Sequence, residues 1–523
     1  VGGEIGDRLR VSMDKILRHT DIEGAFARHF KVRKEKPDEP GGFAGYGMFL
    51  DALVKGAAHG IGGEASIALK TRLLRELAAT QTPDGQITMF LREPGYWDNH
   101  ENAYMIQAYV RDWLWFGETN SLETAKRLAD SLIARRAWVT LGTETAFNLL
   151  YGATRERRYI DYLKDVCFLE KPFAFYDAQL RVNGVQHVYT WLARAIGQME
   201  YADLCGFTSP SDRTRFGAPA FEALRRARGP HLSISGSITG TPRWGELWDA
   251  SQIGLGNWGE TCASAYLMRL CARMSEWDGR SALYDLYERV MYNAFFSAQS
   301  EDGLKYCYFT PFNARVDWWP RETYCCPNNF RRMVFEIPDA VFRRSDDGLA
   351  VCLYAPAELR AAGVEAKMAT RYPADGRVAL DVKMAPGVKT LRLRIPAWCK
   401  AARVTVAGET TETASAAPGW FEIRRDFSAG VQVTLDLPMP IRLIRGARAQ
   451  EGRVAVMRGP CVYALEPEPN GLQADGDIDL WDLDAARPLT WMPERQSVEV
   501  TLRLRHRQRT EKLMELTRYF KER

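Results

Sequence analysis

Three cysteines and one glutamate stand out because their types and spacing suit metal chemistry. Cys325 and Cys326 are adjacent in the stretch ETYCCPNNF, and Glu260 and Cys262 stand two apart in WGETCASAYL. Adjacent cysteines are poorly placed for a mutual disulfide, because bridge geometry requires Cα atoms about 4.4–6.8 Å apart and converging Cβ vectors. Three thiols and one carboxylate are instead a four-ligand set that zinc commonly accepts.

The spacing of these residues is not that of a zinc ribbon or finger, so two interpretations stay open. In the first they form a zinc site, and Pro327 fixes the tight turn that lets both adjacent cysteines ligate one ion. In the second they are buried core thiols beside a glutamate that caps a helix. A zinc site would in turn be structural, or catalytic with an open position. It could also present a zinc-bound thiolate as the nucleophile, since coordination deprotonates the thiol.

A thiolate that attacks the anomeric carbon of a sugar would need a carboxylic acid to protonate the leaving oxygen. Glu246 is the candidate, because it stands in a loop rich in Gly, Pro and Trp between expected helices. The neighbouring Trp244, Trp248 and Trp258 could raise its pKa by desolvation and offer flat faces to a sugar ring. The alternative is that these tryptophans belong to the core.

The elements that must position these residues change character along the chain. From about Gly45 to Ser300, apolar residues recur every three or four positions in successive segments, as in LETAKRLADSLIARR. Short polar links such as TPDG separate the segments. We expect about ten helices, arranged as helical hairpins that close into an α/α barrel.

After about Ala340 the pattern alternates between apolar and polar residues, which is typical of strands. It predicts an antiparallel β-sandwich from the segments 377–384, 390–396, 402–408, 431–437 and 453–459. The last stretch, TLRLRHRQRTEKLMELTRYFKER, predicts a strand followed by an exposed helix, whose basic residues favour a solvated face over a binding tail. The expected division is a barrel over 1–340, a sandwich over 341–470 and an extension over 471–523.

The composition limits which kinds of binding partner and which cellular location we expect for this protein. The chain has 523 residues, enough for more than one core, and a formal net charge of +4, which gives no reason to expect nucleic acid. No apolar run approaches the 18 or so residues of a membrane span. Ten cysteines without the dense spacing of a secreted scaffold favour reduced thiols and a cytoplasmic location. The chain begins at Val1 rather than Met, so any preceding segment is not visible.

At this point the chain resembles glycoside hydrolase family 127 and its relatives, the bacterial β-L-arabinofuranosidase group. The similarity is dense over about 240–466 and looser in the helical half, and the ETC and CCPxN combination is its most specific part. The matching stretches, in the family's order, are GELWDA, GETCASA, YNAFFSAQSEDGLKYCYFTPF, CCPNNFRRM, LAVCLYAPAEL, LRLRIPAWC, GWFEIRRDF, VTLDLPM and GRVAVMRGPCVYALE.

The resemblance implies an (α/α)6 barrel followed by β-sandwich modules, and a retaining exo-glycosidase that uses a zinc-bound cysteine. It further implies the following roles: Glu260, Cys262, Cys325 and Cys326 as zinc ligands, Cys325 as nucleophile, Glu246 as general acid/base, and His187 as a histidine of the sugar pocket. For His187 the alternative is a histidine at a helix start that bonds to the backbone. The expected substrate is a plant-derived oligosaccharide or glycoconjugate, with no nucleic-acid or membrane partner, and a homodimer stays open.

The sequence departs from the family in the first helical half. The GH motifs that hold sugar hydroxyls there correspond to WDNHENAYMIQAY and TLGTETAFNLLYG, so His100 is the candidate to replace one of those histidines. The enzyme could therefore act on a different terminal sugar. Two further alternatives are a non-catalytic carbohydrate-binding protein with structural zinc, and an epimerase or lyase, which would leave the cysteines unexplained.

Overall fold

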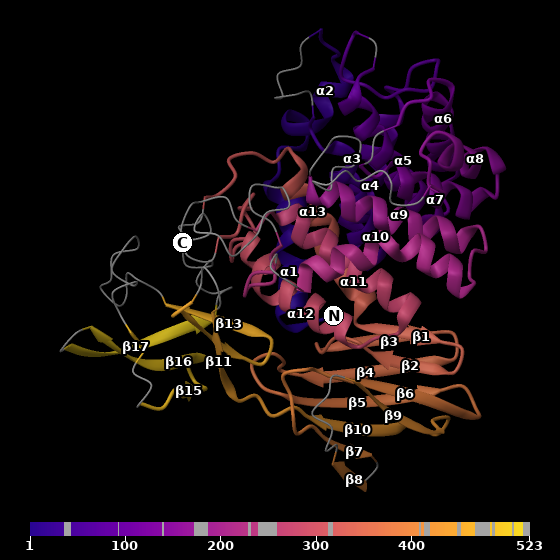
Figure 1. Ribbon diagram of the computed structural model, residues 1–523. Coiled ribbons are helices and arrows are strands. Elements are labelled where there is room, and N and C mark those ends of the chain that lie inside the picture. The colour runs from indigo at the N-terminus through magenta and orange to yellow at the C-terminus, as the bar shows by residue number, and fades with distance from the viewer. Residues whose placement is uncertain are drawn as a thin grey trace.

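A computed structural model describes residues 1–35, 43–92, 94–138, 141–171, 187–228, 232–238, 259–311, 317–406, 409–412, 419–446, 451–465, 482–483, 487–504 and 507–515. Helices make up the N-terminal part, and strands follow from Phe342 (Figure 1). The predicted α-plus-β organisation is confirmed. The closure of the helices into a barrel, the packing of the sheets as a sandwich and the domain boundaries stay predictions.

The helices divide into buried ones and ones with a solvent face. Residues of α3, α9 and α11 are buried on nearly all sides, whereas α4 and α6 bury one stripe each, so the amphipathic helices cover the buried ones. The α-helices of the described chain are α1 Gly3–Asp14, α2 Arg28–Lys31, α3 Tyr46–Ala58, α4 Gly63–Ala78, α5 Tyr96–Phe116, α6 Thr119–Ala134, α7 Thr143–Thr154, α8 Arg157–Asp165, α9 Val188–Leu204, α10 Pro210–Arg228, α11 Thr261–Asp278, α12 Ala282–Val290 and α13 Cys325–Val334. Short π or 3₁₀ turns are η1 Lys15–His19, η2 Glu23–Ala27, η5 Met291–Phe295, η6 Phe296–Ala298 and η7 Ile337–Ala340.

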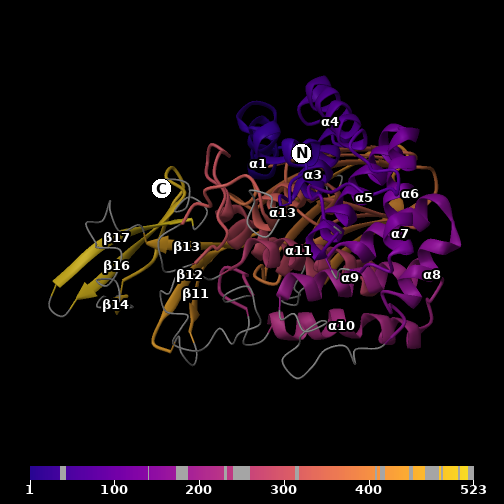
Figure 2. The same ribbon diagram turned by 90° about the horizontal axis from the view of Figure 1, so that it is seen from above.

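The strands form three sheets, ordered β1-β2-β6-β9, β3-β4-β5-β10-β7-β8 and β11-β12-β13-β17-β16-β14, with β15 on β16. Two views place the third sheet to one side of the molecule (Figures 1 and 2). The strand bounds are β1 Phe342–Ser345, β2 Gly348–Val351, β3 Ala357–Ala361, β4 Val364–Thr370, β5 Arg377–Met384, β6 Val388–Ile395, β7 Arg403–Val406, β8 Glu409–Glu412, β9 Gly419–Asp426, β10 Val431–Asp436, β11 Ile441–Arg445, β12 Val454–Arg458, β13 Cys461–Leu465, β14 Asp482–Leu483, β15 Thr490–Met492, β16 Ser497–Leu504 and β17 Arg507–Glu515.

The strand predictions are confirmed in position and corrected in two details. All five alternating segments form strands, and β5 alternates buried with more exposed residues as expected. The prediction of purely antiparallel pairing is wrong for β2 and β6, which run parallel, because the strands between them lie in another sheet and return the chain in the same direction. The predicted helix after the last strand is wrong over 507–515, since β17 pairs there with β13 and β16.

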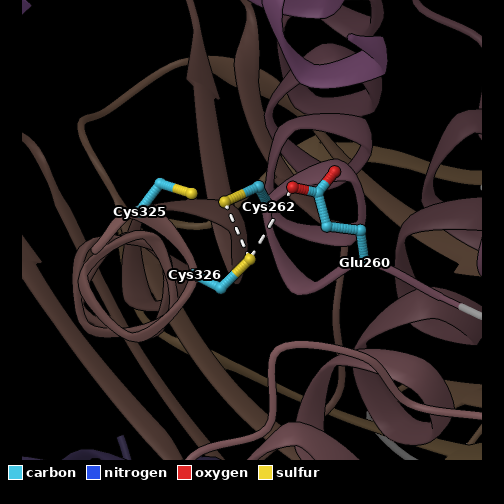
Figure 3. A group of neighbouring side chains, drawn as sticks. All are labelled: Glu260, Cys262, Cys325 and Cys326. Carbon is cyan, nitrogen blue, oxygen red and sulfur yellow. Dashed lines mark hydrogen bonds between the residues drawn. The ribbon is translucent and has the colours of Figure 1, made fainter. Parts of the chain in front are cut away.

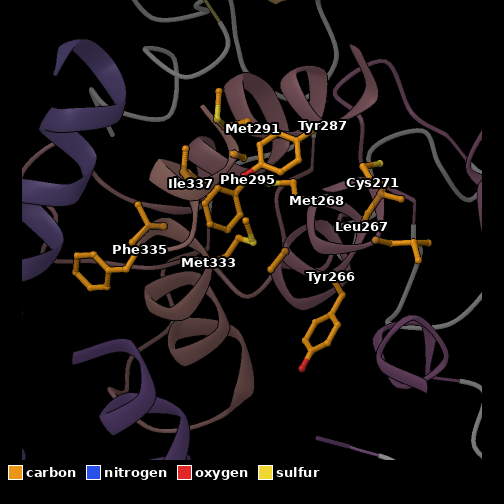
Figure 4. Close-up of a cluster of buried hydrophobic side chains, with 14 of the residues drawn as sticks. Tyr266, Leu267, Met268, Cys271, Tyr287, Met291, Phe295, Met333, Phe335 and Ile337 are labelled. Carbon is orange, nitrogen blue, oxygen red and sulfur yellow. The ribbon is translucent and has the colours of Figure 1, made fainter. Parts of the chain in front are cut away.

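The helices that carry the cysteines share one apolar core. Figure 4 shows buried side chains from α11, from α12 and η5, and from α13 with the residues after it, gathered between these elements. The rings of Phe295 and Phe330 stack at 4.4 Å, and Met268 and Met333 are buried with them. This packing fixes the start of α13 against the start of α11.

A buried ion network joins the helices to the first sheet. Arg394 of β6 is fully buried and donates to Asp285 and Glu288 of α12, both at 2.6 Å, and to the carbonyl oxygen of Cys352. Tyr372 donates to the same Glu288 carboxylate. Because these charged groups are removed from water, the loss of one group would leave its partners buried without a counter-charge and would destabilise the fold.

We expect Arg394→Met to lower the free energy of unfolding by about 3–5 kcal/mol, because two carboxylates would stay buried without their cation. Arg392 of the same strand is the matched control, since it pairs with the half-exposed Asp347 and Glu422. Arg392→Met should cost about 0–1 kcal/mol. Urea denaturation of both variants measures the difference, and equal costs would contradict a stabilising role for the buried network.

Candidate metal centre and active site

Glu260 and Cys262 are positioned by the start of α11. Gly259 has φ +70°, and a side chain there would meet the Thr310 backbone oxygen at 2.9 Å, so glycine is required. Glu260 precedes the helix and lies opposite Phe309 in a short β-bridge. Its side chain makes no capping hydrogen bond, so the capping interpretation of this glutamate is wrong.

Cys325 and Cys326 open α13, so the adjacent cysteines occupy the first turn of a helix. Tyr324 before them has φ +84°, a strained conformation for a residue with a side chain. The Asn328 amide donates to the Tyr324 carbonyl oxygen at 2.7 Å and holds this bend. Pro327 is compatible with the first turn, where a backbone N–H has no helical partner.

The four side chains converge from the two helix starts (Figure 3). One ligand atom from each of Glu260, Cys262, Cys325 and Cys326 lies within 4.8 Å of all the others, and all four residues are buried. Cys262 Sγ lies 3.2 Å from Cys326 Sγ, which in turn lies 3.7 Å from a Glu260 oxygen. Zinc bound at about 2.3 Å needs sulfurs roughly 3.8 Å apart. The donor types and their closeness are compatible with one metal ion, whose binding would move the sulfurs of Cys262 and Cys326 slightly apart.

The three thiols differ in accessibility and acidity. Cys325 is 7% exposed, whereas Cys262 and Cys326 are fully buried. Burial raises the pKa of Cys262 and of Cys326. Hydrogen bonds from these two neighbours hold the pKa of Cys325 well below its ordinary value. The Tyr308 hydroxyl lies 3.5 Å from Cys325 Sγ. Cys325 is thus the cysteine of the three best suited to react.

The two predicted histidines lie near this cluster in different ways. His187, at the start of α9, places Nε2 3.2 Å from a Glu260 oxygen, and its side chain makes no helix-capping bond. Fully buried His100 of α5 lies edge-on to Phe43 at 4.3 Å, and burial lowers its pKa to about 3. Within the described chain neither ring nitrogen of His100 has a hydrogen-bond partner. The imidazole is therefore neutral, with one nitrogen able to donate a hydrogen bond and the other able to accept one.

Several polar residues near the thiols escaped the sequence analysis. Tyr104 and Tyr266 share a hydrogen bond of 2.8 Å, and the Tyr189 ring lies 5.4 Å from the Tyr266 ring. Asn329 donates to Cys262 Sγ at 3.2 Å. Tyr308 and Asn329 stand inside the stretches KYCYF and CCPNNF, so closeness to the cysteines in the chain was the available signal. No sequence signal points to the three other tyrosines.

Other predicted site residues cannot be placed. Glu246 lies outside the described residues, as do Trp244, Trp248 and Trp258. All ten cysteines lie inside them, and none is joined in a disulfide. Among the helices that the structure describes, none combines the length and the apolar character needed to cross a bilayer.

Comparison with family models matches two parts of the chain. Residues 54–339 match the model described as β-L-arabinofuranosidase, GH127 catalytic domain. Residues 348–439 match the GH127 middle domain of the same description. The catalytic-domain match covers more than half of the chain and includes all four residues of the cluster.

Individual relatives agree with these matches. A non-reducing end β-L-arabinofuranosidase of Bifidobacterium longum is 25% identical over 500 residues, covering 81% of this chain and 74% of that protein. A solved GH127 β-arabinofuranosidase has a TM-score of 0.81 at 21% identity, covering 99% of this chain and 93% of the other. A solved GH127 β-L-arabinofuranosidase of Geobacillus stearothermophilus T6 has a TM-score of 0.74 at 22% identity, with 98% and 94% covered. The two solved structures share the fold of this chain.

Proposed function

The chain belongs to glycoside hydrolase family 127, and from this premise we propose that it is a retaining, exo-acting β-L-arabinofuranosidase with the Cys325 thiolate as nucleophile. It is a glycoside hydrolase, and the proposal concerns its sugar and its mechanism. The observation that carries the proposal is the asymmetry of the buried cluster, in which Cys325 alone of the three cysteines is partly accessible. Such a thiol is a suitable nucleophile.

In the proposed reaction Cys325 Sγ attacks C1 of the terminal sugar. A C1–S bond forms while the C1–O bond to the leaving group breaks, and Glu246 gives its proton to the departing oxygen. The Glu246 carboxylate then takes a proton from water, whose oxygen attacks C1 as the C1–S bond breaks and the thiolate leaves. Two displacements at C1 return the original anomeric configuration.

A metal ion fits the donor set, and we propose that it is zinc held by Glu260, Cys262, Cys325 and Cys326. When bound, zinc would keep the thiols deprotonated and stabilise the departing thiolate. His187 Nε2 lies against the Glu260 carboxylate and orients it. Cys262 and Cys326, fully buried, would hold their places without touching substrate.

The remaining parts of the proposal follow from the family. The helices would close into an (α/α)6 barrel and the first two sheets would pack as a sandwich, with the reduced thiols in a cytoplasmic protein. The substrate would be a terminal furanoside of a plant-derived glycan, and His187 and His100 would face its hydroxyls. The stretch TLGTETAFNLLYG, which corresponds to a family GH motif, has no histidine, and its Glu144 is paired with Arg194 at 3.1 Å. This difference favours, as a second candidate, another terminal sugar handled by the same mechanism.

We expect the protein to hydrolyse nitrophenyl β-L-arabinofuranoside faster than the other nitrophenyl glycosides of a matched panel. Proton NMR of the first product formed should show the β-anomer, because two displacements retain configuration. An α-anomer as the first product would contradict a covalent intermediate. Faster turnover of another glycoside would favour the second candidate.

The substitution Glu246→Gln tests whether Glu246 is the general acid. It should lower kcat/KM for a substrate with a poor leaving group by roughly 10²–10⁴-fold and kcat/KM for a nitrophenyl substrate much less, since kcat/KM reports the first displacement and nitrophenolate departs without a proton. An equal loss on both substrates would argue against this assignment.

A further inference from the structure

Asn329 links the two helices that carry the cysteines. It is fully buried one turn into α13, and its Nδ2 donates to Cys262 Sγ of α11 at 3.2 Å. Cys325 has a different neighbour, because the Tyr308 hydroxyl lies 3.5 Å from its Sγ. An amide is therefore aimed at a thiol that the reaction does not use.

The orientation of this amide is set by Arg332. Arg332 Nη1 donates to Asn329 Oδ1 at 3.1 Å. A guanidinium has donors only, so the oxygen of the amide must face Arg332, and its NH₂ group must face the sulfur. Arg332 is itself buried and held by Asp51 Oδ2 at 2.6 Å and by Gln107 Oε1 at 2.8 Å. Asp51 of α3 and Gln107 of α5 thus hold Arg332, and Arg332 in turn leaves the Asn329 amide one orientation.

The charges behind Asn329 suit a negatively charged centre. Zinc with three thiolates and one carboxylate has a net charge of about −2. The ion cluster next to Asn329 has four cationic side chains and two carboxylates, namely Lys55, Arg111, Arg269 and Arg332 with Asp51 and Glu336. Burial and then the charge of Arg111 lower the pKa of Lys55 to about 7, which is consistent with a surplus of positive charge.

We propose that Asn329, oriented by Arg332, is a positioning residue that keeps Cys262 as a non-reacting thiolate ligand. The hydrogen bond from Asn329 fixes the direction of the Cys262 side chain, so Cys262 stays in place while Cys325 reacts. This inference rests on the proposed function, because it assumes that the cluster holds a metal. It adds that Cys262 and Cys325 have different roles, and that Asn329, one turn further along α13, maintains this difference.

The test compares Asn329→Asp with the wild type after replacing the bound metal by Co²⁺. The substitution keeps the shape, removes the N–H donor and places a carboxylate beside the sulfur. We expect metal affinity, measured by competition with a chelator, to fall about 10- to 100-fold. The sulfur-to-cobalt charge-transfer band should move to longer wavelength, because a sulfur without its hydrogen bond gives up an electron more easily.

Asn293→Asp is the matched control. Asn293 is equally buried and donates to the carbonyl oxygens of Arg289 and Pro460, not to the cysteines of the cluster. It should change stability and leave the band and the affinity unchanged. Asn329→Leu, which brings in no charge, gives the same test if the aspartate variant does not fold, and should shift the band in the same direction.

The outcomes separate this inference from the proposed function. An unshifted band and unchanged affinity in both Asn329 variants would overturn the inference alone, with the thiolate centre intact. A wild type without any thiolate–cobalt band would overturn both. A band shift of the same size in Asn293→Asp would show a general effect of burying a carboxylate and would likewise overturn the inference.

Discussion

Cys325→Ser should lose turnover by roughly 10³-fold or more while keeping its fold, because a serine hydroxyl in this position is a far weaker nucleophile than a thiolate. The side chain is the most accessible of the three cysteines, so the substitution changes little of the packing. Steady-state kinetics on the nitrophenyl substrate measures the loss. Circular dichroism and zinc analysis show whether fold and metal remain.

Cys326→Ser is the matched control, because it changes the adjacent residue in the same way. Cys326 is fully buried, and its sulfur contacts both Cys262 and Glu260, so the main effect should be weaker zinc binding and lower stability. When zinc is supplied in excess, this variant should recover more activity than Cys325→Ser. A haloacetamide glycoside should label Cys325 alone. Full activity in Cys325→Ser would rule out the thiolate mechanism.

Removal of zinc is expected to abolish turnover and destabilise the helical part of the protein. Without the ion, burial again favours the protonated form of Cys262 and Cys326, and the centre that joins the starts of α11 and α13 loses its attraction. At free zinc about 1,000-fold above the Kd, the loss of stability is about 4 kcal/mol. Elemental analysis should find about one zinc per chain, with Zn–S distances near 2.3 Å.

The effect of zinc removal should be reversible. Adding zinc back after the chelator should restore turnover and the melting temperature together, and calcium or magnesium should restore neither, since both prefer oxygen ligands. Freshly purified protein that is fully active without any transition metal would contradict the assignment.

Much of the fold could be predicted because local patterns encode local structure. Apolar residues recur every 3–4 positions in α6 and at alternate positions in β5, and these patterns predict which face of each element is buried. Local patterns do not encode strand direction and partner, since β2 and β6 pair in parallel although β3, β4 and β5, which lie between them in the chain, belong to another sheet. The segment after β16 was misjudged as a helix, and its pairing with β13 supplied the long-range contacts that make it a strand.

The sequence by itself identified Glu260, Cys262, Cys325 and Cys326 as candidate metal ligands, because three thiols and a carboxylate are a ligand set that zinc accepts. Only the tertiary structure decided how these four residues differ in exposure and in their contacts. Three features make this distinction: the accessibility of Cys325, the contact of His187 with Glu260, and the hydrogen bond from the Asn329 amide to Cys262. Each depends on residues that are far apart in the chain. The physical reason is that ligand type is a property of one side chain, whereas burial, orientation and hydrogen bonding are created only when α9, α11 and α13 pack together.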